Sequence, residues 1–158
     1  MTDTAPEPSA DALADLIEAQ MHLEGPLLPI LHAIHEAYGY IPPSAPMAIA
    51  ERLNLGRAEV HGVISFYHDF RKAPAGRHVV KICRAEACQS VGGAALSEAV
   101  LAKLGIGWGG TTANGAVTIE PVYCLGLCAS GPAAMVDGKV VGRLDQARFD
   151  RVLAELGA

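Results

Sequence analysis

The stretch from residue 78 to residue 88 reads His-Val-Val-Lys-Ile-Cys-Arg-Ala-Glu-Ala-Cys. Its first half is rich in β-branched residues, which predicts a buried strand over residues 78–83. Cys83 ends this strand, and Cys88 follows in a segment that we expect to be a loop. The stretch therefore predicts a sheet that carries a pair of cysteines at the end of one strand.

A second stretch repeats this design. Residues 117–123 read as another strand, Cys124 follows it directly, and Cys128 comes next. The full spacing is C-x4-C, then 35 residues, then C-x3-C. Two strand-end loops can meet at one edge of a sheet, so we expect the four thiolates to face a single site.

Four thiolates suit either an iron–sulfur cluster or a structural zinc ion, and ligand softness does not separate the two. Zinc sites also use closely spaced pairs. Both pairs are surrounded by small residues: Ala85, Ala87, Gly92, Gly93, Gly126, Ala129, Ser130 and Gly131. Small side chains let backbone N–H groups approach the sulfides of a cluster. These residues favour the cluster and leave zinc as the alternative. Disulfides are disfavoured in a reducing compartment, and no C-x-x-C pair indicates a thiol–disulfide oxidoreductase.

The rest of the second half predicts a mixed sheet with helices. A helix is expected over residues 94–104, ended by Gly105, and a hairpin over residues 133–142 turns at Asp137-Gly138. A last helix begins near Asp145. The predicted order is β-α-β-β-β-α, an α/β arrangement. The glycine-rich segment 105–110 follows a helix and has no Walker lysine, so we interpret it as a flexible loop rather than a phosphate site.

The first half predicts four helices. They are expected from the N-cap Ser9 to residue 21, over residues 26–38 before Gly39, over residues 44–53, and from Gly56 to residue 70. The third is expected to turn Met47, Ile49, Ala50 and Leu53 inward. We therefore predict a helical bundle, with a docking role, in residues 1–72 and a separate domain in residues 76–158. The histidines in the first half, His32, His35, His61 and His68, are interpreted as ordinary surface or interface residues.

Composition excludes several classes of function. The chain has 158 residues, of which 51% are hydrophobic and 18% charged, so a packed core is expected. Its net charge of −5 gives no reason to propose nucleic acid as a partner, since phosphate binding needs a basic surface. No apolar run approaches the roughly 18 residues of a membrane span, and Met1–Ala10 lacks the pattern of a secretory signal. We therefore expect a cytoplasmic protein with no direct membrane insertion.

The second half resembles the thioredoxin-like [2Fe-2S] ferredoxins, through Cys83-x4-Cys88 and Cys124-Leu-Gly-Leu-Cys128 followed by Gly131-Pro132-Ala133. The first half resembles the helical domain that precedes this ferredoxin in the 24-kDa-type subunit of respiratory complex I. The matching stretches are residues 27–32, 38–42 and 58–67. The resemblance implies a helical bundle followed by a thioredoxin-like domain, one [2Fe-2S] cluster on Cys83, Cys88, Cys124 and Cys128, no catalytic residue, and a cis peptide before Pro132.

Within this family, Cys83-Arg-Ala-Glu-Ala-Cys88-Gln-Ser looks like the gamma subunit of soluble, molybdenum-containing, NAD-dependent formate dehydrogenase. Complex I members often have proline directly before the second cysteine, where this chain has Ala87. The resemblance implies a non-catalytic electron-transfer subunit. Its implied partners are a flavoprotein with FMN, NAD and a [4Fe-4S] cluster, and a molybdopterin subunit that oxidises formate. Complex I, a hydrogenase diaphorase and a zinc-stapled adaptor remain alternatives. Arg84, beside a ligand, is expected to moderate negative charge at the cluster.

Overall fold

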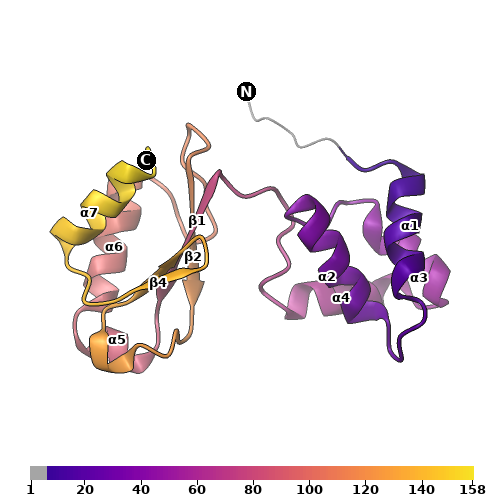
Figure 1. The fold of residues 1–158 in the computed structure, drawn as a ribbon, viewed down its shortest axis with the longest axis horizontal. Coiled ribbons are helices and arrows are strands. Elements are labelled where there is room, and N and C mark those ends of the chain that lie inside the picture. Colours follow the sequence, from indigo (N-terminus) through magenta and orange to yellow (C-terminus); the bar gives the residue numbers. More distant parts are fainter. Residues whose placement is uncertain (1–6) are drawn as a thin grey trace. The chain divides into compact units, whose positions relative to one another are not determined.

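The computed structural model describes residues 7–158 of the chain. The chain forms two compact units, with the boundary between Pro74 and Ala75 (Figure 1). The expectation that Met1–Ala10 contains no secretory signal falls mostly on residues 1–6, which lie outside the described residues. Each unit has its own apolar core, so each is described separately below.

The first unit consists of four helices: α1 (Ala10–Gln20), α2 (Leu27–Tyr38), α3 (Ala45–Leu53) and α4 (Arg57–Phe66). Their ends follow from local chemistry. The Ser9 side chain accepts a hydrogen bond from the backbone N–H of Ala12 at 3.2 Å, as an N-cap should. Gly39 takes the left-handed conformation, with φ 76°, that ends α2. The Glu59 carboxylate accepts from the backbone N–H of Gly56 at 2.7 Å and so caps α4.

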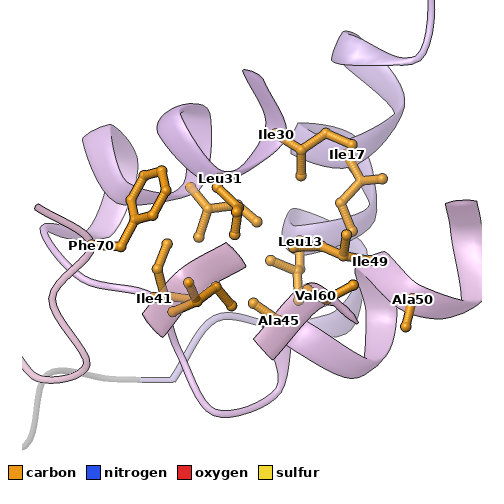
Figure 2. Packing of buried hydrophobic residues seen from close by; sticks show 12 residues of the cluster. Leu13, Ile17, Ile30, Leu31, Ile41, Ala45, Ile49, Ala50, Val60 and Phe70 are labelled. Atoms are coloured by element: carbon orange, nitrogen blue, oxygen red, sulfur yellow. The ribbon is translucent and has the colours of Figure 1, made fainter. Parts of the chain in front are cut away.

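One apolar cluster fills the space between these helices. Its buried side chains come from all four of them and from the segments around Ile41 and Phe70 (Figure 2). Ala45 and Ile49 lie one helical turn apart on α3 and both point into it. The buried stripe explains why four helices, each too short to be stable alone, hold together.

Two expectations for this unit are wrong. Met47 is not turned inward, because its side chain is 46% exposed. It lies two residues from both Ala45 and Ile49, about 200° around the helix, so burying that stripe turns Met47 outward. The fourth helix does not reach residue 70 but ends at Phe66, where Tyr67 adopts an extended conformation. Phe70 still joins the core, from the segment beyond the helix.

The second unit contains a sheet and helices in the expected order, with two short helices added, one after the first strand and one after the second. Its elements are β1 (His78–Cys83), α5 (Glu86–Ser90), α6 (Gly93–Leu104), β2 (Val117–Val122), the 3-10 helix η1 (Cys128–Ser130), β3 (Ala134–Val136), β4 (Lys139–Val141) and α7 (Gln146–Glu155). Cys88 lies in α5 and not in the expected loop. The sequence Glu-Ala-Cys-Gln-Ser has no periodic apolar stripe, so its single turn gives no helical signal.

The sheet has the strand order β2-β1-β3-β4. β1 pairs with β2 in parallel, with Cys83 opposite Val122, and with β3 in an antiparallel manner. Figure 1 shows α6 and α7 side by side along this sheet, and their buried residues share one cluster with Val80, Ile82, Val117 and Ile119. Since β1 and β2 run in the same direction, both end at one edge, and each is followed there by cysteines.

The glycine-rich segment 105–110 is a loop, as expected, but it is tied to the sheet. The backbone N–H of Gly109 donates to the carbonyl of Ile119 at 2.8 Å, and Ile119 N–H donates to the carbonyl of Gly110 at 3.1 Å. Trp108 packs against the core of this unit. Among residues 7–158, no helix has the length and apolar character needed to cross a membrane.

Asp137, in the turn between β3 and β4, ties this hairpin to β1. Its carboxylate accepts from the backbone N–H of Val79 at 2.9 Å and contacts His78 Nδ1 at 2.7 Å. Burial raises the pKa of Asp137, but the hydrogen bonds from Val79 and His78 and the charges of His78 and Lys139 outweigh it and lower that pKa overall. The ionised carboxylate therefore stabilises the folded state.

We predict that Asp137→Asn lowers the free energy of unfolding by about 1 kcal/mol at pH 7, because one charge-assisted hydrogen bond is weakened while the turn is kept. A group with a lowered folded pKa stabilises above its unfolded pKa, about 3.9, and loses that effect as pH falls through the folded value. Urea unfolding should therefore show the same difference in the free energy of unfolding between the wild type and Asp137→Asn at every pH from 5 to 8. A difference that vanishes within that range contradicts the prediction; Glu98→Gln, on exposed α6 surface, is the control.

Candidate metal centre

Two cysteine pairs follow the ends of β1 and β2 at one edge of the sheet. Cys83 is the last residue of β1, and Cys88 lies in α5, which follows it. Cys124 lies two residues beyond β2, and Cys128 begins η1. α5 packs beside η1, which brings the two cysteine-bearing segments together. The two strand-end pairs lie at the same edge of the sheet, and the expectation that all four thiolates face a single site stays a prediction.

The pair Cys83 and Cys88 is buried. Both thiols are free, and they form a small apolar cluster with Ala133. The backbone N–H of Cys83 donates to the carbonyl of Ala133 at 3.0 Å, which fixes the end of β1 against the segment after η1. This pair is therefore held inside the unit by the sheet itself.

The pair Cys124 and Cys128 is exposed, and its two sulfur atoms lie 3.9 Å apart. Two thiolates bound to one tetrahedral metal at about 2.3 Å would be separated by roughly 3.8 Å. The backbone N–H of Gly126 donates to Cys124 Sγ at 3.3 Å, a contact that suits an anionic sulfur. Cys124 has a φ of 136°, rare outside glycine, so the backbone is strained at this position.

The thiols affect one another's ionisation. Burial, the hydrogen bond with Cys83 and the charges of Cys83 and Cys128 raise the pKa of Cys88. The neighbouring Cys124 is the main cause that raises the pKa of Cys128. Gathering four thiolates here costs free energy unless positive charge joins them. A cationic metal centre supplies that charge and displaces the thiol protons.

The arrangement of the thiols in two pairs suits a two-metal centre. One pair is buried and the other is exposed. Negative charge on one pair raises the pKa of a thiol in the other pair. Two thiolate pairs are what the two irons of a [2Fe-2S] cluster need, and the all-sulfur donor set suits iron–sulfur chemistry. Among residues 7–158, no three histidine, cysteine, aspartate or glutamate side chains lie close enough together to hold one metal ion, and this includes the four cysteines, which lie as two pairs.

Glycines let the backbone pack tightly around the buried pair. A Cβ atom on Gly93 would lie 2.6 Å from the carbonyl oxygen of Cys88, and one on Gly131 would lie 3.3 Å from Cys88 Sγ. Gly131 also precedes Pro132, and the peptide between them is cis, which confirms that expectation. Two of the small residues noted in the sequence, Gly93 and Gly131, therefore have a steric role, since a larger residue at either position would push against Cys88.

Arg84 makes a contact that sequence reasoning missed. Its guanidinium carbon lies 5.0 Å from the centre of the Trp108 ring, a cation–π arrangement. The carbonyl of Arg84 also accepts from Gln89 Nε2 at 2.6 Å. Trp108 could have been singled out as the one tryptophan of the chain, placed in a glycine-rich segment. The expected influence of Arg84 on charge at the site stays a prediction.

Three histidines of the first unit make contacts within that unit. His32 and His35 pack edge-on against the ring of Phe70, at 5.1 and 6.0 Å between ring centres. His68 Nδ1 lies 2.9 Å from the carbonyl oxygen of Phe66. These contacts are local to the helical unit, and the interpretation of the histidines as ordinary surface or interface residues stays a prediction.

Comparison with known proteins gives consistent matches. The family model described as thioredoxin-like [2Fe-2S] ferredoxin matches residues 13–157. The HndA protein, part of an NADP-reducing hydrogenase from Solidesulfovibrio fructosivorans, is 31% identical over 150 residues, covering 95% of this chain and 88% of that protein. The NADH-quinone oxidoreductase of Pseudomonas aeruginosa has a subunit that is 36% identical over 130 residues, covering 80% and 78% of the two chains.

Among solved structures, an NAD+-reducing [NiFe]-hydrogenase in the H2-reduced state is similar, with a TM-score of 0.65 and 28% identity. The match covers 80% of this chain but only 22% of the hydrogenase chain, so this chain corresponds to one part of a much longer polypeptide.

We predict that Gly93→Ala lowers the iron content of the purified chain and destabilises the second unit. The new Cβ would meet backbone atoms of Cys88, which cannot rotate away, so α5 must shift at an expected cost of about 1–3 kcal/mol. Gly107→Ala is the matched control, because its Cβ would meet nothing within 4 Å. Iron analysis and thermal unfolding would measure both effects. Equal iron content and stability in the two variants would show that the close packing is unimportant.

Proposed function

Because the chain belongs to the thioredoxin-like [2Fe-2S] ferredoxin family and so carries a [2Fe-2S] cluster, we propose that Cys83, Cys88, Cys124 and Cys128 are its ligands. All four fall within the residues matched by the family model. Their pairing at one edge of the sheet is the observation that carries the assignment. The pairing alone would also suit zinc, and the zinc-stapled adaptor, the alternative from another class, is disfavoured because the family to which the chain belongs carries a [2Fe-2S] cluster.

When bound, the cluster supplies one-electron oxidation and reduction without a bond to a substrate. The chain's own task is to hold four thiolates and to moderate their negative charge. The backbone N–H of Gly126, directed at Cys124 Sγ, is one group that does so. Neither a general base nor a nucleophile is required, so we assign no catalytic residue.

The exposed pair marks the side through which electrons are exchanged. Cys124 and Cys128 are open to solvent, whereas Cys83 and Cys88 are buried. The surrounding segment 123–131 contains no charged residue, and Tyr123 within it is 67% exposed. An uncharged, partly apolar surface at the accessible edge suits close contact with a protein partner.

We assign the chain to an NAD-dependent formate dehydrogenase as its electron-transfer subunit. In this assignment a flavoprotein subunit with FMN, NAD and a [4Fe-4S] cluster, and a molybdopterin subunit that oxidises formate to CO2, are its partners. The support is the filling of the first ligand loop, Cys83-Arg-Ala-Glu-Ala-Cys88, with Ala87 in place of the proline frequent in complex I. Residues 117–124 have the same resemblance.

A second assignment follows from the names of the relatives. The hydrogenase protein and the quinone oxidoreductase protein both align with most of this chain. Both favour an equivalent electron-transfer subunit in an NAD-linked hydrogenase or in complex I. All three assignments share the same role for the cluster and differ in the subunit that oxidises the substrate.

Purifying the tagged chain anaerobically from its native host, with its bound partners, would separate these assignments. The formate dehydrogenase assignment predicts formate-dependent reduction of NAD and molybdenum in the assembly. Hydrogen-dependent reduction of NAD by an assembly that contains nickel would favour the hydrogenase assignment instead. Reduction of a quinone by NADH would favour the complex I assignment. An assembly with none of these activities would contradict the proposal as a whole.

We predict that Cys128→Ala removes the visible absorption and the low-temperature EPR signal of the reduced cluster, because one iron loses a ligand. The melting temperature of the second unit should fall with it, since ligation contributes to folding. Ala129→Ser is the matched control: it alters the neighbouring exposed position and leaves the thiols intact. An unchanged [2Fe-2S] spectrum in Cys128→Ala would refute this ligand assignment.

A further inference from the structure

The helical unit contains an open pocket of about 500 Å³, here named the proline pocket. It lies where the segment before α3 meets α3 and α4. Most of its lining is apolar: Ile41, Pro42, Pro43, Pro46, Met47 and Ile64. The volume is near the lower end of the range for ligand sites, about 300–1,000 Å³, which suits one or two side chains rather than a whole helix.

The walls of the proline pocket are preformed. Proline has a fixed φ and no backbone N–H, so Pro42, Pro43 and Pro46 offer water no backbone donor and little freedom to rearrange. The backbone N–H of Ile41 donates to the carbonyl of Arg71 at 2.7 Å, which fixes the position of the lining segment that begins at Ile41. Met47, exposed against expectation, adds an adaptable apolar surface. A rigid, poorly hydrated pocket loses little entropy when it binds an apolar side chain.

The charge around the proline pocket is opposite to that of its unit. Residues 1–74 contain ten Asp and Glu but only four Lys and Arg. Two of those four cations, Arg57 and Lys72, line the pocket together with His61, and no carboxylate among residues 7–74 belongs to the lining. Basic groups therefore surround the apolar pocket of an otherwise acidic unit. This predicts an occupant with an apolar side chain that enters the pocket and with carboxylates on either side of that side chain.

We propose that the proline pocket binds a segment of a partner subunit in which one or two large apolar side chains are flanked by Asp or Glu. The apolar side chain enters between the prolines and Met47, and the carboxylates pair with Arg57 and Lys72. The identity of the partner as a subunit of an oxidoreductase complex rests on the proposed function, whereas the chemistry of the segment rests on the pocket alone.

Photo-crosslinking in the native assembly tests the occupant. The photoreactive amino acid p-benzoylphenylalanine replaces Met47 in the full chain, and mass spectrometry identifies the crosslinked peptide. The same replacement at Leu23, 38% exposed and outside the pocket lining, is the control. A peptide from another subunit with apolar residues beside Asp or Glu, specific to position 47, supports the proposal. A peptide from a second copy of this chain, a segment without carboxylates, or no specific crosslink overturns it.

Affinity measurements test the chemistry of the pocket. Met47→Glu should weaken binding of the chain to its purified partner subunits at least tenfold, because it places a carboxylate in the apolar site. Charge reversal of Arg57 and Lys72 to Glu should do the same, with a weaker salt dependence than the wild type. Leu23→Glu should stay within twofold of wild type. Met47→Glu within twofold of wild type overturns the proposal, provided that circular dichroism shows the helices intact.

The cluster spectrum separates this proposal from the proposed function. Variants of the proline pocket should keep the full [2Fe-2S] absorption, because all the pocket residues lie in the first unit and the cysteines in the second. If the assembly lacks formate-dependent activity but the acidic segment still crosslinks at position 47, the assignment to formate dehydrogenase fails and the pocket proposal stands. If activity is present without that crosslink, the reverse holds.

Discussion

Parallel pairing of β1 with β2 is the constraint on which the cysteine site depends. The register that sets Cys83 opposite Val122 also buries Val80, Ile82, Val117 and Ile119 under α6 and α7. A slip of one residue would turn those side chains away from the helices and carry Cys83 to the other face. The apolar core therefore fixes the position of the first cysteine pair, and the strands end where the second pair begins.

Much of the fold could be predicted because its signals are local. Serine and aspartate at N-caps, glycine after helices, β-branched runs and the Asp-Gly turn each act within a few residues, and the structure has them where they were expected. The cysteine spacing, read with two strand ends, was enough to place both cysteine pairs at one edge of the sheet. What it could not give was their division into a buried and an exposed pair, which depends on how α5 and η1 pack.

The errors arise where tertiary packing outweighs a local pattern. Met47 is apolar and lies on a helix. The core buries Ala45 and Ile49 instead, and Met47 consequently points outward. Cys88 lies in a helix of one turn, too short for any periodicity to be visible. Arg84 and Trp108 are far apart in the sequence, and only the pairing of the glycine-rich loop with β2 brings them into contact. Such contacts carry no signature in a single sequence.

The position of Trp108 has a practical consequence for spectroscopy. It is the only tryptophan of the chain, and it touches the residue that follows Cys83. Its fluorescence therefore reports on the cysteine-bearing unit alone, while far-ultraviolet circular dichroism is weighted toward the helices. A coloured centre close to the indole would quench its emission by energy transfer. One emission trace could thus follow metal uptake and melting of that unit in real time, without any label and without interference from the helical unit.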